Sequence, residues 1–337
     1  MKRILSLITV ILVTVFALAY ALWDVDIAEL GSLLSGGNYW LLVPFLGLLV
    51  LFYWMKALRW VFILRPVGKF TTSEVTPSMV IGFAANNVLP AHLGELVRIA
   101  IFSHRYGKPV SSIAITLLVE RIFDLVAILS LYALAMVTIT TPPASLEIGA
   151  WFITLLLAVF FASIGVVLYK PSLVLNMGNR IGAFLPERFQ HRLTSTLENI
   201  IHAFSSLRSP KLVAAMTVWS LLKWLLMGGM IWVSLYAYGT EISPAISLVL
   251  MAVLALAAAV PNAPGYIGAI QAAYVFALKP FGIAEEAAFA ASIFFLVCQW
   301  LPVTVAGAIY FIAGGLHVGE VRKEIEEVEK LESPGTE

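Results

Sequence analysis

Ionisable side chains occur inside two otherwise apolar segments of this sequence. The first segment holds three of them just after Pro90, and the next holds three more. They are His92, Glu95, Arg98, Glu120, Arg121 and Asp124. An ionisable group in the hydrocarbon region of a membrane costs several kcal/mol unless it is paired or reached by water. These residues are therefore the first candidates for a functional site.

The spacing of these groups indicates which of them share a helical face. Glu95 and Arg98 are three residues apart, and Glu120 and Asp124 are four apart. Both spacings bring side chains together on a helix. Arg121 follows Glu120 directly and belongs to the same group. In a functional site, the carboxylates would orient the arginines or receive a cationic headgroup.

A helix that restarts after Pro90 would offer an anion a second kind of donor. Its first N–H groups, at residues 91–94, have no partner within the helix, and the helix dipole favours a negative charge there. The arginine guanidinium adds a bidentate donor that suits phosphate. We expect Arg98 and Arg121, with His92, to hold the phosphate of a lipid. The alternative is that the charged groups only neutralise one another, although apolar packing would fasten the helices at lower free-energy cost.

The composition places these groups in a membrane protein. The 337 residues are 61% hydrophobic and 12% charged, and the mean hydropathy of +0.94 is far above that of a water-soluble domain. The single cysteine, Cys298, excludes an internal disulfide and a cysteine-cluster metal site. The sequence has no phosphate-binding Gly-rich loop, nucleophile elbow or HExxH zinc motif. We therefore expect a protein without a cofactor that moves or binds a lipid rather than transforming it.

Six apolar runs are long enough to cross a membrane, because a helix of about 20 residues spans the hydrocarbon core. They cover residues 4–23, 39–64, 113–139, 147–169, 212–238 and 287–316. Two further apolar segments, 77–103 and 243–278, are interrupted in the middle by Asn, Pro and Gly. We predict an all-α integral membrane protein with six transmembrane helices and two re-entrant broken hairpins.

Lysine and arginine in the short loops set the orientation, because cytoplasmic loops carry an excess of them. Lys2 and Arg3 precede the first run, and the second run ends in Arg59, Arg65 and Lys69. We expect a multi-pass protein of the cytoplasmic membrane with both termini in the cytoplasm, hairpins that enter from opposite faces, and a charged cytoplasmic tail at 317–337. Tryptophans are expected at the two interfaces, with Trp23, Trp40 and Trp151 outside and Trp60 inside.

A span, a broken hairpin and a span recur with inverted orientation. The two copies cover about residues 39–139 and 212–316 within a single membrane domain, residues 1–316. Inverted repeats with interrupted helices are typical of secondary transporters, which bind substrate near the membrane midplane. In the second hairpin, Asn262, Tyr266 and Gln271 either complete the site or satisfy backbone groups that the break frees. Lys223 and Gln299, in flanking spans, are weaker candidates.

Two external acids keep an enzymatic alternative open. Asp24 and Asp26 follow the first run, and two carboxylates can bind a divalent ion, as a lipid-linked glycosyltransferase of the membrane class would require. Acidic residues at an external helix end are also what membrane topology alone produces. A third alternative is a structural membrane partner for another enzyme.

One stretch of the chain resembles the signature of a known family. Residues 86–126 carry Asn-x-x-Pro-x-x-x-Gly-Glu-x-x-Arg and a later Glu-Arg-x-x-Asp, similar to the lysylphosphatidylglycerol synthase transmembrane, or flippase-like, family. Residues 261–283 resemble that family's second Pro/Gly element. The resemblance implies movement of phospholipids, hopanoid-related lipids or polyprenyl-linked lipids between leaflets, although some members were named as archaeal glycosyltransferases. It implies a site made of Asn87, Pro90, Gly94, Glu95, Arg98, Glu120, Arg121 and Asp124.

The chain departs from the family pattern in two places. Gln271 stands where many relatives have a glutamate, which puts recognition of a cationic, lysine-bearing headgroup in doubt. The chain ends soon after its last span, so the soluble aminoacyl-transfer domain of the bifunctional synthases is expected to be absent. We expect membrane lipids with a phosphate headgroup as ligands, a homo-oligomer or a partner synthase as further options, and no nucleic acid.

Overall fold

The computed structural model describes residues 14–89, 93–141, 143, 155, 159, 166, 170–183, 190, 210–259, 263–317, 319 and 321. These residues form helices joined by turns, and no strand occurs among them. Three described helical stretches are long and apolar enough to cross a membrane: Tyr39–Ile63, Lys211–Tyr236 and Glu285–Ala313. The prediction of an all-helical membrane protein is confirmed.

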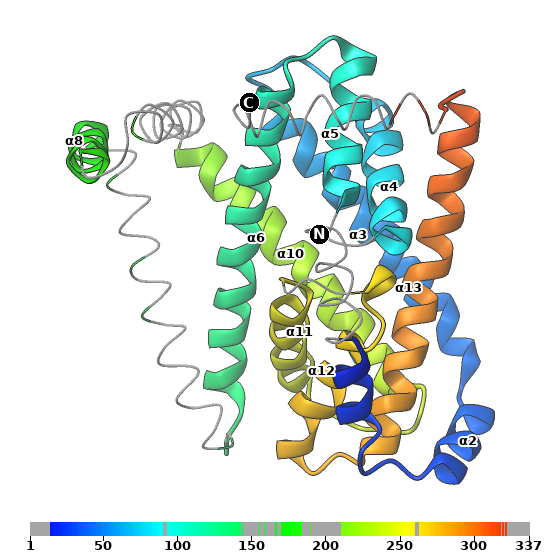
Figure 1. Cartoon of the computed structure of the whole chain (residues 1–337). Coiled ribbons are helices and arrows are strands. Elements are labelled where there is room, and N and C mark those ends of the chain that lie inside the picture. The colour runs from blue at the N-terminus through cyan, green and yellow to red at the C-terminus, as the bar shows by residue number, and fades with distance from the viewer. Residues whose placement is uncertain are drawn as a thin grey trace.

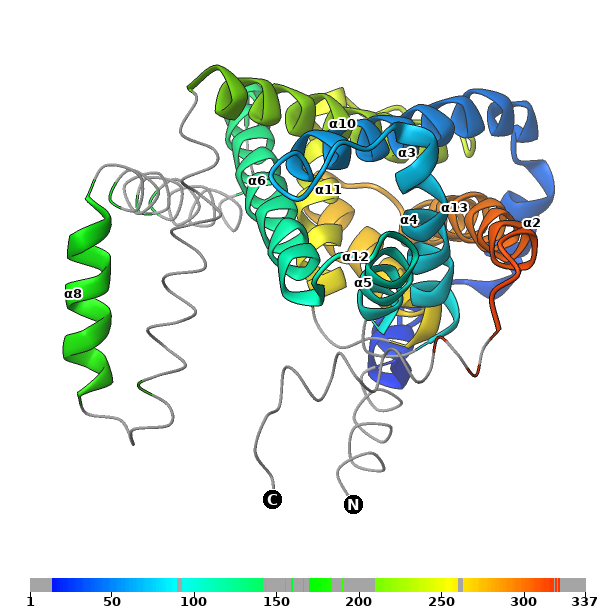
Figure 2. The same cartoon turned by 90° about the horizontal axis from the view of Figure 1, so that it is seen from above.

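The described helices form a bundle, and α8 lies apart from it in both views (Figures 1 and 2). The elements in chain order are α2 (Ile27–Gly36), η1 (Tyr39–Leu41), α3 (Leu42–Ile63), α4 (Thr72–Val88), α5 (Leu93–Tyr106), α6 (Val110–Thr138), α8 (Pro171–Gly182), α10 (Pro210–Tyr236), α11 (Pro244–Ala259), η2 (Pro264–Tyr266), α12 (Ala269–Leu278), η3 (Lys279–Phe281) and α13 (Glu285–Ala313). Among the shorter helices, α4 packs on α13 and α5, α11 packs on α6 and α12, and α2 packs on α13.

Two helix pairs, α4 with α5 and α11 with α12, form hairpins that enter the bundle from opposite ends (Figure 1). The base of the first hairpin is closed by hydrogen bonds. The Thr71 N–H donates to Glu74 Oε2 at 2.7 Å, and the Tyr106 hydroxyl donates to the Glu74 carbonyl at 3.1 Å. The first bond caps the start of α4, and the second holds it against the end of α5.

The second hairpin breaks at glycine positions with left-handed backbone. Gly265 and Gly268 have φ of 71° and 86°, which glycine adopts without a steric penalty. Tyr266 between them has φ of 61°, which is strained for a residue with a side chain. The Gly268 N–H then donates to Gln271 Oε1 at 2.7 Å and caps the start of α12.

The helix packing is reciprocal between the two halves of the bundle. The first hairpin helix, α4, packs on α13, and the first helix of the other hairpin, α11, packs on α6. The helices that precede the hairpins, α3 and α10, pack on each other. If α3, α4, α5 and α6 are matched in order with α10, α11, α12 and α13, each helix therefore packs on the counterparts of its match's neighbours in these two sets.

Glycines allow the closest approach inside the first hairpin. A Cβ atom on Gly94 would overlap the Gly82 carbonyl oxygen, and a Cβ on Gly82 would lie 2.7 Å from the Gly94 carbonyl oxygen. On the other side of α4, a Cβ on Gly307 of α13 would overlap the Ala84 side chain. Most of the contacting atoms belong to the backbone, so a larger side chain at these glycines could not be accommodated by a change of side-chain rotamer in its neighbours.

Gly94→Ala is expected to lower the free energy of unfolding by about 1–3 kcal/mol or more, because the added methyl group overpacks α4 against α5. The measurement is the thermal unfolding midpoint in detergent. Gly47→Ala is the matched control, since Gly47 is also helical but has open space at its Cβ. The control should be neutral or more stable, because alanine favours helix. Equal midpoints for the two variants would contradict the close packing of the hairpin.

Four predicted spans correspond to described helices. The runs 39–64, 113–139, 212–238 and 287–316 match α3, α6, α10 and α13, and each broken segment forms a helix pair. The run 4–23 is described only from residue 14, and most of the run 147–169 and the tail after residue 321 lie outside the described residues.

Candidate functional site

Two helices carry facing charges at matched spacing inside the bundle. Lys56 and Arg59 lie on α3, and Glu120 and Asp124 lie on α6. All four side chains are buried, and Arg59 is 0% exposed. Because residues one helical turn apart share a face, the two pairs form a ladder of ion pairs between α3 and α6.

Glu120 holds three cations. Its Oε2 accepts a hydrogen bond from Arg98 Nη2 at 2.9 Å, and its Oε1 lies 3.3 Å from Arg59 Nη2 and 3.4 Å from Lys56 Nζ. Arg98 comes from α5, and its guanidinium lies over the Trp60 ring at 3.7 Å. One carboxylate of α6 therefore binds both α3 and α5.

Asp124 extends the ion pairs to α10. Its Oδ1 accepts from Arg59 Nη1 and from Lys223 Nζ, each at 2.5 Å, and from Trp224 Nε1 at 3.0 Å. Arg59 Nη1 also donates to Ser220 Oγ at 2.6 Å. Asp124 thus joins α3, α6 and α10 at a single carboxylate oxygen.

These buried groups contain more positive than negative charge. The charge cluster, as we call it, has four basic side chains and two carboxylates, which is a formal excess of two positive charges when all six are ionised: Lys56, Arg59, Arg98, Lys223, Glu120 and Asp124. Three buried donors, Arg59 Nε, Arg59 Nη2 and Arg98 Nε, have no hydrogen-bond partner among the described residues. Uncompensated buried charge costs several kcal/mol per ion, so the cluster favours a nearby anion.

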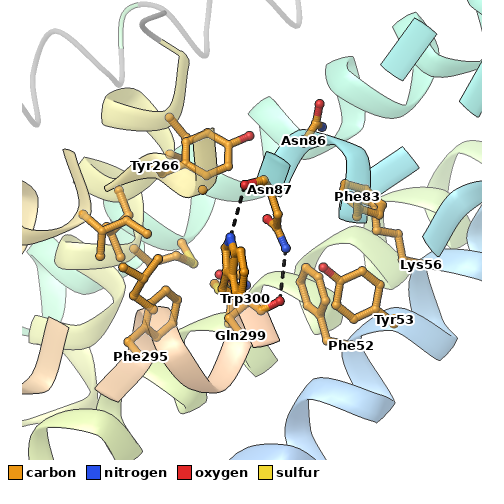
Figure 3. Close-up of a pocket in the computed structure, with 18 of the residues that line it drawn as sticks. Phe52, Tyr53, Lys56, Phe83, Asn86, Asn87, Tyr266, Phe295, Gln299 and Trp300 are labelled. Atoms are coloured by element: carbon orange, nitrogen blue, oxygen red, sulfur yellow. Dashed lines mark hydrogen bonds between the residues drawn. The ribbon is translucent and has the colours of Figure 1, made fainter. Parts of the chain in front are cut away.

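A cavity of about 190 Å³ lies beside the charge cluster (Figure 3). Residues from α3, α4, α6, α10, α11, η2, α12 and α13 form its wall, so it lies where the two hairpins and the long helices meet. Much of the wall is aromatic and includes Phe52, Tyr53, Phe83, Tyr266, Phe295 and Trp300. An apolar wall with a few polar groups is typical of a small-molecule site.

Lys56 brings the charge of the cluster to the cavity wall. Its side chain is 7% exposed, and its one ion pair among the described residues is the 3.4 Å contact with Glu120. The ammonium also lies over the Phe83 ring at 4.0 Å. Lysine has three N–H donors, so Lys56 can still donate to a ligand in the cavity.

Arg121 and Glu95 form an ion pair at the rim of the cavity. Arg121 is 53% exposed and lines both the cavity and a smaller neighbouring pocket, which Glu95 lines as well. Arg98 and Glu120 face that smaller pocket. The charge cluster is therefore flanked by two spaces, and Arg121 borders both of them.

Asn87 fastens the tip of the first hairpin to α13. Its Nδ2 donates to Thr304 Oγ1 at 2.9 Å and to the Trp300 carbonyl at 3.2 Å, and Trp300 Nε1 donates back to the Asn87 carbonyl at 3.2 Å (Figure 3). Asn87 and the strained Tyr266 both line the cavity. Strained backbone of this kind concentrates at functional sites.

Other predicted site residues have local structural partners. The Gly94 N–H donates to Asn86 Oδ1 at 2.7 Å, so it is not free to bind an anion. Gln271 is buried, caps α12 and does not line the cavity, which fits the reading that it satisfies backbone freed by the break. Pro90, His92 and Asn262 lie outside the described residues.

Two sequence-based interpretations are wrong. The sequence places Arg59 at the exposed end of a span, but its side chain is fully buried in the charge cluster. It places Trp60 at the inner membrane interface, but Trp60 is 0% exposed and its Nε1 donates to Thr116 Oγ1 at 3.1 Å. Trp23 and Trp40 are exposed as an interfacial position requires, and Trp151 lies outside the described residues.

The two acids after the first apolar run, Asp24 and Asp26, both have structural partners. Asp26 Oδ1 accepts from the N–H groups of Ala28 and Glu29 and caps α2. Asp24 pairs with Lys279 at 3.3 Å, and Glu285 and Asp24 together raise the pKa of Lys279 through hydrogen bonds. Within the described part of the chain, no group of three or more His, Cys, Asp or Glu side chains is placed to hold a metal ion.

The helices and the buried charges define an integral membrane protein with a charged cavity between two hairpins. The chain belongs to the lysylphosphatidylglycerol synthase TM region family, whose family model matches residues 4–307. Membership of this family indicates a lipid-related function in the membrane. The chain is also similar to the glycosyltransferase AglD of Haloferax volcanii, with 29% identity over 136 residues. That match covers 40% of this chain and only 22% of AglD.

Proposed function

We propose that this protein binds the phosphate headgroup of an anionic lipid in the cavity and passes the lipid between the two leaflets of the membrane. The observation that carries the proposal is the excess of two buried positive charges beside the cavity. Hydrocarbon provides no counter-ion for such charges. A negatively charged ligand is therefore the partner that lowers their free energy most.

The reciprocal packing of α3–α6 and α10–α13 supports an inverted repeat. In this proposal, each copy is a span, a re-entrant hairpin and a span, and together with two further spans they give six in all. Both termini then lie on the cytoplasmic side of the cytoplasmic membrane. Transporters built in this way bind substrate between the halves, which is where the cavity lies. The two halves would expose it alternately to either leaflet.

The small cavity suits a headgroup while the hydrocarbon chains stay in the bilayer. Lys56 would bind the phosphate directly, and the rest of the charge cluster would supply the positive potential. Arg121 at the rim would attract the headgroup before it enters. The aromatic wall would exclude water around the bound phosphate, which strengthens these ion pairs.

The test is leaflet accessibility of fluorescent phospholipids in proteoliposomes, measured by dithionite quenching. Ala255→Phe should slow translocation about tenfold or more, because Ala255 lines the cavity and a phenyl ring would fill it. Leu256→Phe is the matched control, since the neighbouring side chain is 64% exposed on the outside of α11. Equal rates for the two variants, or no quenching beyond the outer leaflet for any anionic lipid, would contradict the proposal.

A lipid-linked glycosyltransferase is the second candidate, favoured by the similarity to AglD. The external acids would then bind the metal ion, and Asp24 would have to leave Lys279 to do so. Asp24→Asn should in that case abolish activity, while Arg98→Ala should leave it unchanged. The opposite pattern is expected if the charge cluster carries the function.

A further inference from the structure

The charge balance around the cavity limits the kind of ligand that fits. Including the rim pair, the described residues around the cavity and its neighbouring pocket provide five basic groups and three carboxylates. With all of them ionised, the formal excess remains two positive charges: Lys56, Arg59, Arg98, Arg121, Lys223, Glu95, Glu120 and Asp124. The charged residues of α4 and α13, Glu74, Glu285 and Glu286, lie at outer helix ends, and α11 and α12 have none.

The two kinds of lipid phosphate differ in how far they compensate this excess. A phosphate diester carries one negative charge and leaves one positive charge unmatched. A phosphate monoester carries nearly two negative charges near neutral pH. Its three terminal oxygens can also accept from several donors at once, and Lys56, which lines the cavity, has three N–H donors.

The size of the cavity points to the same ligand. A volume of about 190 Å³ is below the range of roughly 300–1,000 Å³ that is usual for drug-sized ligands. A headgroup that carries a sugar or an amino acid beyond the phosphate would need more room. A headgroup that ends in the phosphate occupies the smallest volume.

We infer that the ligand of this site is the terminal phosphate monoester of a lipid. This inference rests on the proposed function and narrows it from anionic lipids in general to those with a dianionic headgroup. Free phosphate shares this chemistry, so the experiment must separate the two sources.

The test is binding of dioleoyl phosphatidic acid and dioleoyl phosphatidylmethanol to the full chain in detergent, measured by titration calorimetry. The two lipids differ by one methyl group, which turns the monoester into a diester. Near pH 7.5 the monoester should bind about tenfold more tightly than the diester. Near pH 5 the monoester loses its second negative charge, so the difference in affinity should become smaller. Equal affinities at both pH values would overturn the inference but leave the proposed function standing. Failure of both lipids to bind would overturn both.

Inorganic phosphate separates the lipid from the free anion. It should bind much more weakly than phosphatidic acid, because it lacks the hydrocarbon chains that hold a lipid at the site. Phosphate binding as tight as that of phosphatidic acid would overturn the assignment to a lipid.

Substitutions in the rim pair change the charge balance in opposite directions. Arg121→Gln leaves an excess of one positive charge and should lower the preference for monoester over diester several-fold, whereas Glu95→Gln raises the excess to three and should increase it. Both side chains are partly exposed, so the fold should be retained. Arg105→Gln, at an exposed position near the end of α5, is the matched control and should change nothing. A shift in the same direction for both rim variants would overturn the inference.

Discussion

Lys56→Gln is expected to lower lipid translocation to the rate of protein-free vesicles. Lys56 is the cation of the charge cluster that lines the cavity, and its one ion pair among the described residues is a long contact with Glu120. Glutamine has a similar reach but no charge, so the ligand phosphate loses its direct counter-ion. The cluster keeps an excess of one positive charge, so folding should be unimpaired. The measurement is dithionite accessibility of a fluorescent anionic phospholipid in proteoliposomes.

Lys211→Gln is the control for this substitution. Lys211 is exposed at the start of α10 and lies away from the cavity, so the same chemical change should leave translocation intact. Lys56→Arg should retain part of the rate, because it keeps the charge but adds bulk in a small cavity. Wild-type translocation by Lys56→Gln would remove this residue from the site.

The breaks in the hairpins and the charges of α5 and α6 could be predicted because their signals are local. Proline and glycine interrupt a helix in an apolar run whatever its neighbours are. A charged side chain in hydrocarbon has a high free-energy cost unless it is paired or hydrated, so it indicates a functional or paired position. Glu120 and Asp124 were found in this way, and they lie at the centre of the charge cluster. The same cost of an unpaired charge predicts that Arg98 is paired, and Arg98 is buried against Glu120.

The roles of Lys56, Arg59 and Trp60 could not be predicted by the same reasoning. Near the end of an apolar run, a basic residue and a tryptophan look like interfacial residues, and only the packing of α3 against α4, α6 and α10 brings them inside. One signal was present in the sequence. Lys56 and Arg59 are three residues apart and Glu120 and Asp124 four, so each pair occupies one helical face, and opposite charges on two such faces favour pairing of the helices.

Some positions of the family motif contribute to packing, which a motif cannot distinguish from ligand binding. Gly94 allows α5 to approach Gly82, and its N–H is bound by Asn86. Gln271 caps a helix inside the bundle. A motif shows which residue types occur at each position. The hydrogen-bond partners in the structure show whether a residue caps a helix, packs against a neighbour or is available to bind a ligand.

Glu120→Gln should lower the free energy of unfolding by about 3–5 kcal/mol, because it removes the charge that holds three buried cations. Arg98, Arg59 and Lys56 would then share Asp124 with Lys223, and the excess of positive charge would rise from two to three. The measurement is the thermal unfolding midpoint in detergent.

The double variant Arg98→Met with Glu120→Gln separates the lost charge from a general packing defect. Removing the cation that makes the shortest contact with Glu120, at 2.9 Å, returns the excess to two positive charges, so the double variant should unfold at a higher temperature than Glu120→Gln alone. Glu241→Gln, at an exposed position between α10 and α11, is the control and should keep the wild-type midpoint. Additive losses in the double variant would mean that Arg98 and Glu120 stabilise the bundle independently, and the charge excess would then not govern the site.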